Sequence, residues 1–391
     1  MKTTAYLQTI KKNFWQFTAI VFFVSYFILG CVVFDDYGVS IDESFQIKKA
    51  QLNLDYITGK STDLLNYDDR HYGAIAAIQL EFLGKFFPDS RNNFLMRHFY
   101  TFLVFYVSSV FLFFLLRKIK LQTWSALVGV AMYVFHPHIF SHSYYNIKDI
   151  PFLAYFVLAL YSLALLIEKP NWNRAILHGA LSGMLVVYRL PGIFMWGLTF
   201  LALLALWIRE PKQWRVLVAI STLFEMVALG TLIFFMPALW HDPYHELRIF
   251  LSMKLFSWDF KELFMGKFLS PENYPWYYLP VYFGVTTPIL FLTLFLVGTI
   301  NLTIKTSLQK IISDQSELMR WLLLFAFIGP MLLLMVTKPI IYNGWRHEFF
   351  MYPGFVATAA FGFEKISESL MTLHKKKLFY GPVIGIWILF A

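Results

Sequence analysis

Long apolar runs separated by short polar stretches recur along the whole 391-residue chain. A helix needs about 20 mostly apolar residues to cross the hydrocarbon core of a bilayer. The pattern predicts helices at these runs: Phe14–Phe34, Phe99–Leu116, Trp124–Val134, Pro151–Leu166, Ala175–Val187, Ile193–Trp207, Val216–Trp240, Val281–Leu302, Trp321–Val336, Phe349–Phe363 and Leu378–Ala391. The sequence therefore predicts an all-α polytopic membrane protein, with residues 1–391 forming a single transmembrane domain of about 11 helices.

Three of these runs have features of their own. The first follows Lys11 and Lys12, as in a signal peptide, but it is longer than a signal region of about 7–15 residues, so we interpret it as a retained span. The third is short, and we expect its helix to extend past Pro137 or to end there with a kink. The last stops at Ala391 without polar flanks, which fits a chain that is cut off inside a helix.

Lysines and arginines lie in alternate connections between the runs. By the positive-inside rule these connections and the N-terminus face the cytoplasm. They contain Arg117, Lys118 and Lys120; Lys169 and Arg174; Arg209, Lys212 and Arg215; Lys305 and Lys310; and Lys375, Lys376 and Lys377. The outer face then carries two long segments, 35–97 and 241–280, and three short turns around Lys148, Arg189 and Arg346.

The two long outer segments are expected to be ordered. Loops of more than about 12–15 residues are usually functional or disordered, and this composition is not that of a disordered chain. In the first segment, Ile75, Ile78 and Phe82 share one side of a helix, with Gln79 and Lys85 away from it. This stripe predicts an interfacial helix in the first outer loop.

Composition excludes a water-soluble globule. Hydrophobic residues make up 58% of the chain and charged residues 15%, against about 45–50% and about 25% in soluble domains. The net charge of +9 does not indicate nucleic-acid binding, because the cations lie in short clusters between apolar runs. Cys31, the single cysteine, cannot form an intramolecular disulfide.

The first candidate for chemistry is the segment FDDYGVSIDES, which places Asp35, Asp36, Asp42 and Glu43 directly outside the first run. Four carboxylates beside a bilayer are costly unless they are solvated or functional. Asp42 and Glu43 stand at the start of a predicted helix, whose dipole favours ionised carboxylates. They could supply a general base for a hydroxyl group; a helix cap with a solvated neighbour is the alternative.

The second candidate is HPHIFSHSYYNIKDIPF, in which Lys148 and Asp149 precede Pro151. An Asp just ahead of Pro is a helix-start signal, so capping is one interpretation of Asp149. A Lys-Asp pair on a tight outer turn also suits a polar head group. The three histidines of this segment match no zinc-binding spacing, so we do not expect them to bind metal: His136, His138 and His142.

The third candidate joins Arg189, in YRLPG, to the segment YNGWRHEFFMYPG. The five donors of a guanidinium fit phosphate oxygens, whereas an Arg that snorkels to the interface is the alternative. We leave both open for Arg189 and favour a functional role for Arg346, with Trp345 as an interfacial anchor. The other polar residues of the segment are Tyr342, Asn343, His347 and Glu348.

Glu225 lies near the middle of the seventh run. An intramembrane carboxylate suggests function by default. This one lies far below the outer face, so we expect a structural partner in the bundle.

The acidic pair Asp42-Glu43, the YNIKDIPF turn and the YNGWRHEFFMYP segment, in this order, resemble a bacterial branch of the C-type glycosyltransferases. These are similar to protein O-mannosyltransferases and lipid A aminoarabinose transferases. The likeness covers nearly the whole chain through the order of runs and loops, but only these three segments are specific.

The resemblance implies an inverting transferase that takes a hexose-type sugar from a polyprenyl phosphate on the outer side of the plasma (bacterial inner) membrane. It implies Asp42 as base or acceptor-orienting residue, with Glu43 as its neighbour. Asp35 and Asp36 are a rival acidic pair, and no soluble C-terminal domain follows, so the lipid, glycan or protein acceptor stays open.

The chemistry of the outer face agrees with this implication. An activated lipid-phosphate donor requires a base for the acceptor and cations for the departing phosphate. We assign substrate binding to Lys148, Asp149, Arg189, Arg346, His347 and Tyr342, and expect no cofactor and no metal.

Two other classes of protein remain as alternatives. A transporter or lipid flippase would place its substrate site near the membrane midplane. In the sequence, Glu225 is the one acidic residue that is evidently at that depth. A non-catalytic membrane scaffold would not need paired acids and an Arg-His-Glu cluster on one face.

The alternation of basic connections gives a testable topology. In a Cys31→Ser background, Ser61→Cys and Ser270→Cys should react with a membrane-impermeant thiol reagent added to intact cells, because both positions are predicted to lie outside. Labelling that requires lysis would reverse the orientation.

Overall fold

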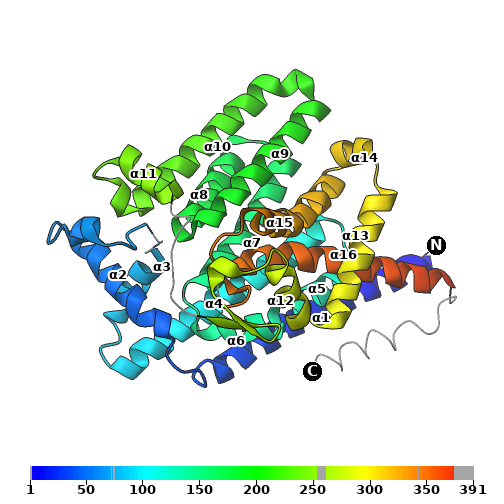
Figure 1. The fold of residues 1–391 in the computed structure, drawn as a ribbon. Helices are drawn as coiled ribbons and strands as arrows, with labels where there is room; N and C mark the ends of the chain where they lie inside the picture. Colours follow the sequence, from blue (N-terminus) through cyan, green and yellow to red (C-terminus); the bar gives the residue numbers. More distant parts are fainter. Residues whose placement is uncertain (1, 72, 74, 253–260, 342, 374–391) are drawn as a thin grey trace.

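The computed structural model describes the chain except for residues 1, 72, 74, 253–260, 342 and 374–391. The last predicted run, Leu378–Ala391, and the basic cluster Lys375–Lys377 lie outside the described residues. The rest folds into a helical bundle with one small hairpin (Figure 1). The predicted all-α polytopic fold is confirmed.

Six helices in the described part of the chain are long and apolar enough to cross a membrane, or seven if one bent pair counts as a single span. They are α1 (Lys2–Val33), α4 (Ser90–Lys118), α7 (Asp149–Glu168), α9 (Phe194–Arg209) with the preceding turn η2 (Leu190–Ile193), α10 (Trp214–Phe235) with η3 (Pro211–Gln213), and α15 (Gln315–Thr337).

The remaining elements complete the bundle and its connections. They are α2 (Ile41–Ile57), η1 (Asp63–Asn66), α3 (Ile75–Gly84), α5 (Thr123–Val134), α6 (Pro137–Tyr145), α8 (Trp172–Tyr188), η4 (Pro237–Leu239), α11 (Pro243–Ser252), β1 (Glu262–Phe264), β2 (Lys267–Leu269), η5 (Pro271–Asn273), α12 (Tyr278–Thr286), α13 (Ile289–Lys305), α14 (Leu308–Ser313), η6 (Arg346–Met351) and α16 (Tyr352–Leu373). The antiparallel strands β1 and β2 pair Leu263 with Phe268.

Helix ends follow local capping chemistry. Asp89 begins α4 by accepting a hydrogen bond from the Asn92 amide at 2.9 Å, and Asn171 begins α8 in the same way. Pro137 stands at the first position of α6, where its missing N–H costs nothing. The third predicted run therefore ends before Pro137, and a separate helix starts there.

One predicted span is wrong as a single helix. The run Val281–Leu302 is divided between α12 and α13, which meet at 117°. Pro288 lies between them, and a proline disfavours helical geometry in the residue before it. The break leaves α12 near the hairpin and α13 against α16.

The helix predicted around residue 75 is present as α3, but its buried side differs from the predicted stripe. Ala76, Ala77 and Leu80 are buried with Ile75, whereas Phe82 is exposed. This happens because α3 packs on α2, α4 and α8, and these contacts determine which side is covered.

The connections fall into two groups at opposite ends of the bundle. At one end of α7, Glu168 pairs with Lys118 at 2.7 Å, and Lys120 pairs with Asp314 at 3.2 Å. At the other end, Asp149 faces groups from the predicted outer segments. The 20 residues of α7 separate these ends by about 28 Å, at 1.5 Å per residue.

Glycines let α13 and α16 approach closely. A Cβ atom added at Gly298 of α13 would meet the Thr358 carbonyl oxygen, and one at Gly362 of α16 would meet the Leu294 carbonyl oxygen. Small residues at such positions bring helix backbones into contact within a membrane. This seam holds α16, and η6 before it, in place.

Gly298→Ala should therefore destabilise the protein by about 1–3 kcal/mol, the usual cost of overpacking. A lower midpoint of thermal unfolding in detergent would show this. Gly230→Ala is the matched control, because a Cβ there meets nothing within 4 Å. Equal midpoints for the two variants would mean that the α13–α16 seam is not tightly packed.

Candidate functional site

The first outer segment begins with a capped helix that separates its two acids. Ser40 accepts a hydrogen bond from the Asp42 amide at 3.3 Å, so the cap is a serine and the Asp42 carboxylate is not used for capping. Asp42 Oδ2 lies 3.0 Å from Arg346 Nη2. Glu43 is instead fully buried, with its Oε2 3.9 Å from His98 Nε2.

The turn before α7 is organised by Asn146. Its side-chain oxygen accepts hydrogen bonds from the amides of Lys148, at 3.2 Å, and Asp149, at 2.8 Å. Its Nδ2 donates to Asp149 Oδ2 at 3.0 Å. The capping interpretation of Asp149 is therefore wrong: Asn146 satisfies the helix start, and the Asp149 carboxylate is held for other partners.

Those partners are two guanidinium groups. Asp149 is 1% exposed, forms an ion pair with Arg189 Nη1, and lies 3.8 Å from Arg346 Nε. Together with Asp42 these residues make an ion-pair chain, Asp42–Arg346–Asp149–Arg189. The chain joins α2, η6, the start of α7 and the end of α8, which are far apart in the sequence.

Arg346 is positioned by the turn and tryptophan that precede it. Asn343 and Gly344 both have positive φ, 58° and 66°, and the Gly344 amide donates to the Tyr278 hydroxyl at 3.2 Å. Trp345 is fully buried and donates from Nε1 to Thr286 Oγ1 at 2.8 Å. The prediction of Trp345 as an interfacial anchor is therefore wrong, because its indole packs inside the bundle.

The two residues after Arg346 are neutralised by their surroundings. Burial and the charge of Arg189 lower the pKa of His347 well below its usual range, and His347 Nε2 accepts from Arg346 Nε at 3.4 Å. Burial raises the pKa of Glu348 to about 8, despite the nearby Arg189. Near pH 7 His347 therefore adds little positive charge and Glu348 little negative charge to the ion-pair chain.

Two lysines add to the positive charge. Burial and the charge of Arg189 lower the pKa of Lys148. Burial and the charge of Lys148 lower the pKa of Lys49 to about 8, against the opposing effect of Asp69. Four cations thus share this region with the carboxylates of Asp42, Asp69 and Asp149, an arrangement that suits an anionic ligand.

Sequence reasoning missed Lys49 as a site residue. The signal was present in the buried side of α2, which is polar: Glu43, Gln46, Lys49, Ala50 and Asn53 are buried. Four polar side chains at helical spacing on one covered side are unusual for packing alone, because buried charges are rare without partners.

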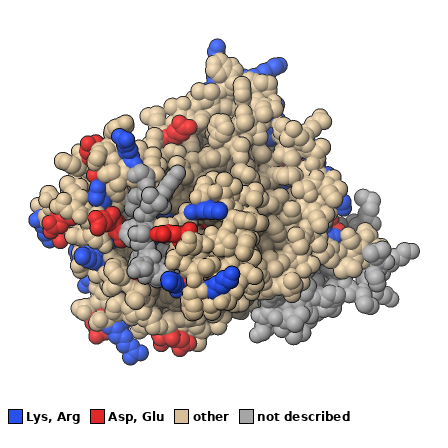
Figure 2. Space-filling model, viewed as in Figure 1, with Lys and Arg blue, Asp and Glu red and all other residues tan. Residues whose placement is uncertain are grey.

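The two long outer segments are tied together beside this region. Glu246 of α11 accepts from Arg70 Nε at 2.9 Å and lies 2.6 Å from His71 Nε2. On the face seen in Figure 2, charged side chains gather mainly over the area of α2, α3 and α11 in Figure 1. The remaining surface of that face is largely uncharged.

The other predicted residues are not part of this cluster. Asp35 and Asp36 are exposed, and Glu225 is exposed on α10 without a hydrogen bond or ion pair to any described residue. The expected structural partner of Glu225 is therefore not found. Tyr342 lies outside the described residues.

The three histidines support the turn from within the bundle. His142 Nδ1 receives a hydrogen bond from Asn146 at 3.1 Å, and the His138 ring packs against Trp345. In the part of the chain that the structure describes, no three His, Cys, Asp or Glu residues form a group that could hold a metal ion.

Comparison with known proteins finds a family model and a solved structure that resemble this chain. The family model "Dolichyl-phosphate-mannose-protein mannosyltransferase" matches residues 14–242, more than half of the chain. The fold is similar to the crystal structure of ArnT from Cupriavidus metallidurans bound to undecaprenyl phosphate, with a TM-score of 0.57 and 14% identity. The alignment covers 95% of this chain and 63% of the ArnT chain. No curated protein matches the sequence.

The buried Glu43 predicts a pH-dependent stability. Burial raises its pKa to about 7, against the effect of Arg97, so the folded protein holds a proton that the unfolded chain releases above about pH 4.5. This stabilisation is complete below about pH 4.5 and is lost as the pH rises through about 7. Glu43→Gln should keep its unfolding midpoint between pH 5 and 7.5 better than the unmodified protein does.

Glu272→Gln is the control, because Glu272 is exposed. Its midpoints should follow those of the unmodified protein at every pH. If Glu43→Gln follows them too, Glu43 is not held protonated in the folded state.

Proposed function

Because the chain belongs to the dolichyl-phosphate-mannose-protein mannosyltransferase family, we propose that it is a membrane glycosyltransferase that uses a polyprenyl-phosphate sugar. The observation that carries the proposal is the ion-pair chain Asp42–Arg346–Asp149–Arg189 at one end of the bundle. Lys49 and Lys148 beside it raise the number of cations to four, against three carboxylates. The fold similarity to ArnT, a structure bound to undecaprenyl phosphate, supports a lipid-phosphate donor.

The donor phosphate binds where the cations outnumber the carboxylates. Arg346 offers a planar fork that can hold two phosphate oxygens, and Lys148 and Lys49 supply single charges beside it. Burial and, second to it, repulsion between the cations lower their pKa values, and a bound phosphate would relieve the repulsion. Asp149 keeps Arg189 and Arg346 in position and does not itself contact the donor.

Asp42 is the general base. Of the pair Asp42-Glu43, Asp42 is the acid that contacts the cation cluster, 3.0 Å from Arg346, while Glu43 is buried against α4. A phosphate that takes the Arg346 Nη2 donor would release Asp42 Oδ2 to accept a proton. The entering donor would thereby prepare the base, which couples binding to chemistry.

The reaction is an inverting displacement. The acceptor hydroxyl gives its proton to Asp42 while its oxygen forms a bond to the anomeric carbon. The bond from that carbon to the phosphate oxygen breaks, and the electron pair leaves with the polyprenyl phosphate. The cations stabilise this departing charge, as oriented donors do in a water-poor site.

The sugar is a hexose type, in keeping with the mannosyltransferase family, and the acceptor is a lipid, glycan or protein at the same face. The protein lies in the bacterial inner membrane with its N-terminus in the cytoplasm and the ion-pair chain on the outer face. The alternation of basic connections supports this orientation.

An in-vitro transfer assay tests the function. Purified protein should move label from radiolabelled polyprenyl-phosphate hexoses to extracted cell-envelope acceptors. Transport of the intact lipid across proteoliposomes without transfer would favour a flippase instead.

Asp42→Asn should lower transfer about 10²-fold or more, the usual contribution of a general base, and leave donor binding in place. The same assay, with binding measured separately, checks this. Asp36→Asn is the matched control, since Asp36 is exposed in the same segment. Full activity of Asp42→Asn with loss in Asp36→Asn would show that the base is misassigned.

Arg346→Lys should lower transfer roughly 10-fold to 10²-fold, because the charge stays and the two-point fork is lost. Lys148→Ala should give a smaller defect that appears in donor binding. Arg91→Lys is the control, because Arg91 is exposed near the start of α4. The same substitution there should leave transfer unchanged. Normal donor binding and transfer in Arg346→Ala would place the phosphate site elsewhere, around Arg189.

A further inference from the structure

A charged cavity lies at the end of the bundle opposite the ion-pair chain. It has a volume of about 490 Å³ and is formed by the end of α13, the start of α14 and the facing sides of α15 and α16. This volume is within the range of about 300–1,000 Å³ that small-molecule sites occupy. By the distribution of basic connections, this end is the predicted cytoplasmic one.

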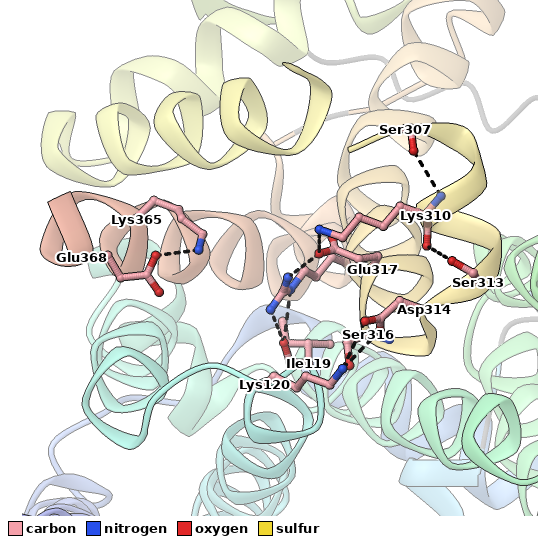
Figure 3. A network of polar contacts seen from close by, with 11 residues as sticks. Ile119, Lys120, Ser307, Lys310, Ser313, Asp314, Ser316, Glu317, Lys365 and Glu368 are labelled. Atoms are coloured by element: carbon pink, nitrogen blue, oxygen red, sulfur yellow. Dashed lines mark hydrogen bonds and ion pairs between the residues drawn. The ribbon is translucent and has the colours of Figure 1, made fainter. Parts of the chain in front are cut away.

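The cavity is positively charged overall. Its charged lining residues are Lys305, Lys310, Arg320, Lys365, Glu317 and Glu368. Glu317 Oε1 is shared by Lys310 Nζ and Arg320 Nη1, each at 3.0 Å, and Lys365 pairs with Glu368 at 2.7 Å. Four cations therefore face two carboxylates. Figure 3 shows Lys310 of α14 directed at Glu317, and Lys365 paired with Glu368 on α16.

One side of the cavity is rigid and the other is adaptable. Arg320 donates to the Ile119 carbonyl from Nε and Nη2, at 3.2 and 2.7 Å, and lies over the Phe361 ring. Lys305 is exposed and makes no hydrogen bond or ion pair with a described residue. The Lys310 and Lys365 side chains are partly exposed, and such pairs are weak, so these amines can turn to an anion at little cost.

The same cavity opens onto apolar surface. Val297, Phe361 and Leu370 line it beside the charges. Next to it on α13, Ile300 and Ile304 are exposed, and Leu308 of α14 is exposed as well. A soluble anion would leave these apolar side chains uncovered, whereas the acyl chains of a lipid would pack against them.

We propose that this cavity binds the phosphate head group of an anionic phospholipid of the cytoplasmic leaflet, with the lysines around the phosphate and the acyl chains along α13. Basic pockets between transmembrane helices on the cytoplasmic side bind such head groups for the same electrostatic reason. Glu317 Oε2 is buried without a hydrogen-bond partner and can accept from a head-group hydroxyl. The site is separate from the proposed transfer reaction.

Lipid binding by purified protein tests this inference. Native mass spectrometry should show retained phosphatidylglycerol, and this lipid should raise the unfolding midpoint more than phosphatidylcholine does. The Lys305→Ala/Lys310→Ala variant should retain phosphatidylglycerol roughly fivefold less for each lysine removed. Lys212→Ala, at an exposed lysine of the same predicted face, should behave as the unmodified protein.

The other outcomes overturn the proposal. Equal retention of phosphatidylglycerol by the double variant and the Lys212→Ala control would show that the cavity is not the site. Stabilisation of the unmodified protein by inorganic phosphate alone would show that the occupant is a soluble anion. If the double variant does not fold, Lys305→Gln, at an exposed position, gives the same comparison with one charge removed.

Discussion

The buried carboxylate of Asp149 anchors the interactions on which the end of the bundle that carries the ion-pair chain depends. A carboxylate with 1% exposure is costly in an apolar bundle, and removing one partner of such a pair typically costs about 3–5 kcal/mol. Arg189, Arg346 and Asn146 supply that partnership. The need to satisfy Asp149 therefore fixes where the end of α8, the turn before α7 and the start of η6 can lie.

The same arrangement keeps the two ends of the bundle chemically different. α7 carries Asp149 in its first turn and Glu168 in its last, and each gathers cations from connections far away in the sequence. At the end that carries the ion-pair chain the charges are buried and crowded, which suits the proposed chemistry on a phosphate. At the other end they are more exposed around a cavity bordered by apolar surface, which suits retention of a lipid.

Arg346 links stability to the proposed reaction. It bridges two carboxylates. Asp149 is buried and paired with Arg189 and Asn146 as well, whereas Asp42 is only partly buried. A phosphate can replace Asp42 at this guanidinium without disturbing the Asp149 pair. The buried Trp345 and the close α13–α16 seam hold η6, so in the proposed reaction the site is rigid on the side of Arg346 and adaptable on the side of Asp42.

The sequence by itself determined the membrane class, most helix positions, the grouping of the connections into two faces and three of the segments that meet at the site. These follow from local properties. The thickness of the bilayer sets the length of an apolar run, and the positive charge of a loop favours the cytoplasmic side of the membrane. Only the tertiary structure decided that Asp42 and Glu43 point apart, that the Asn146 side chain accepts the amides at the start of α7, that Trp345 is buried and that Lys49 joins the cations. Each depends on which residues distant in the sequence pack together, and helical periodicity carries no information about that choice.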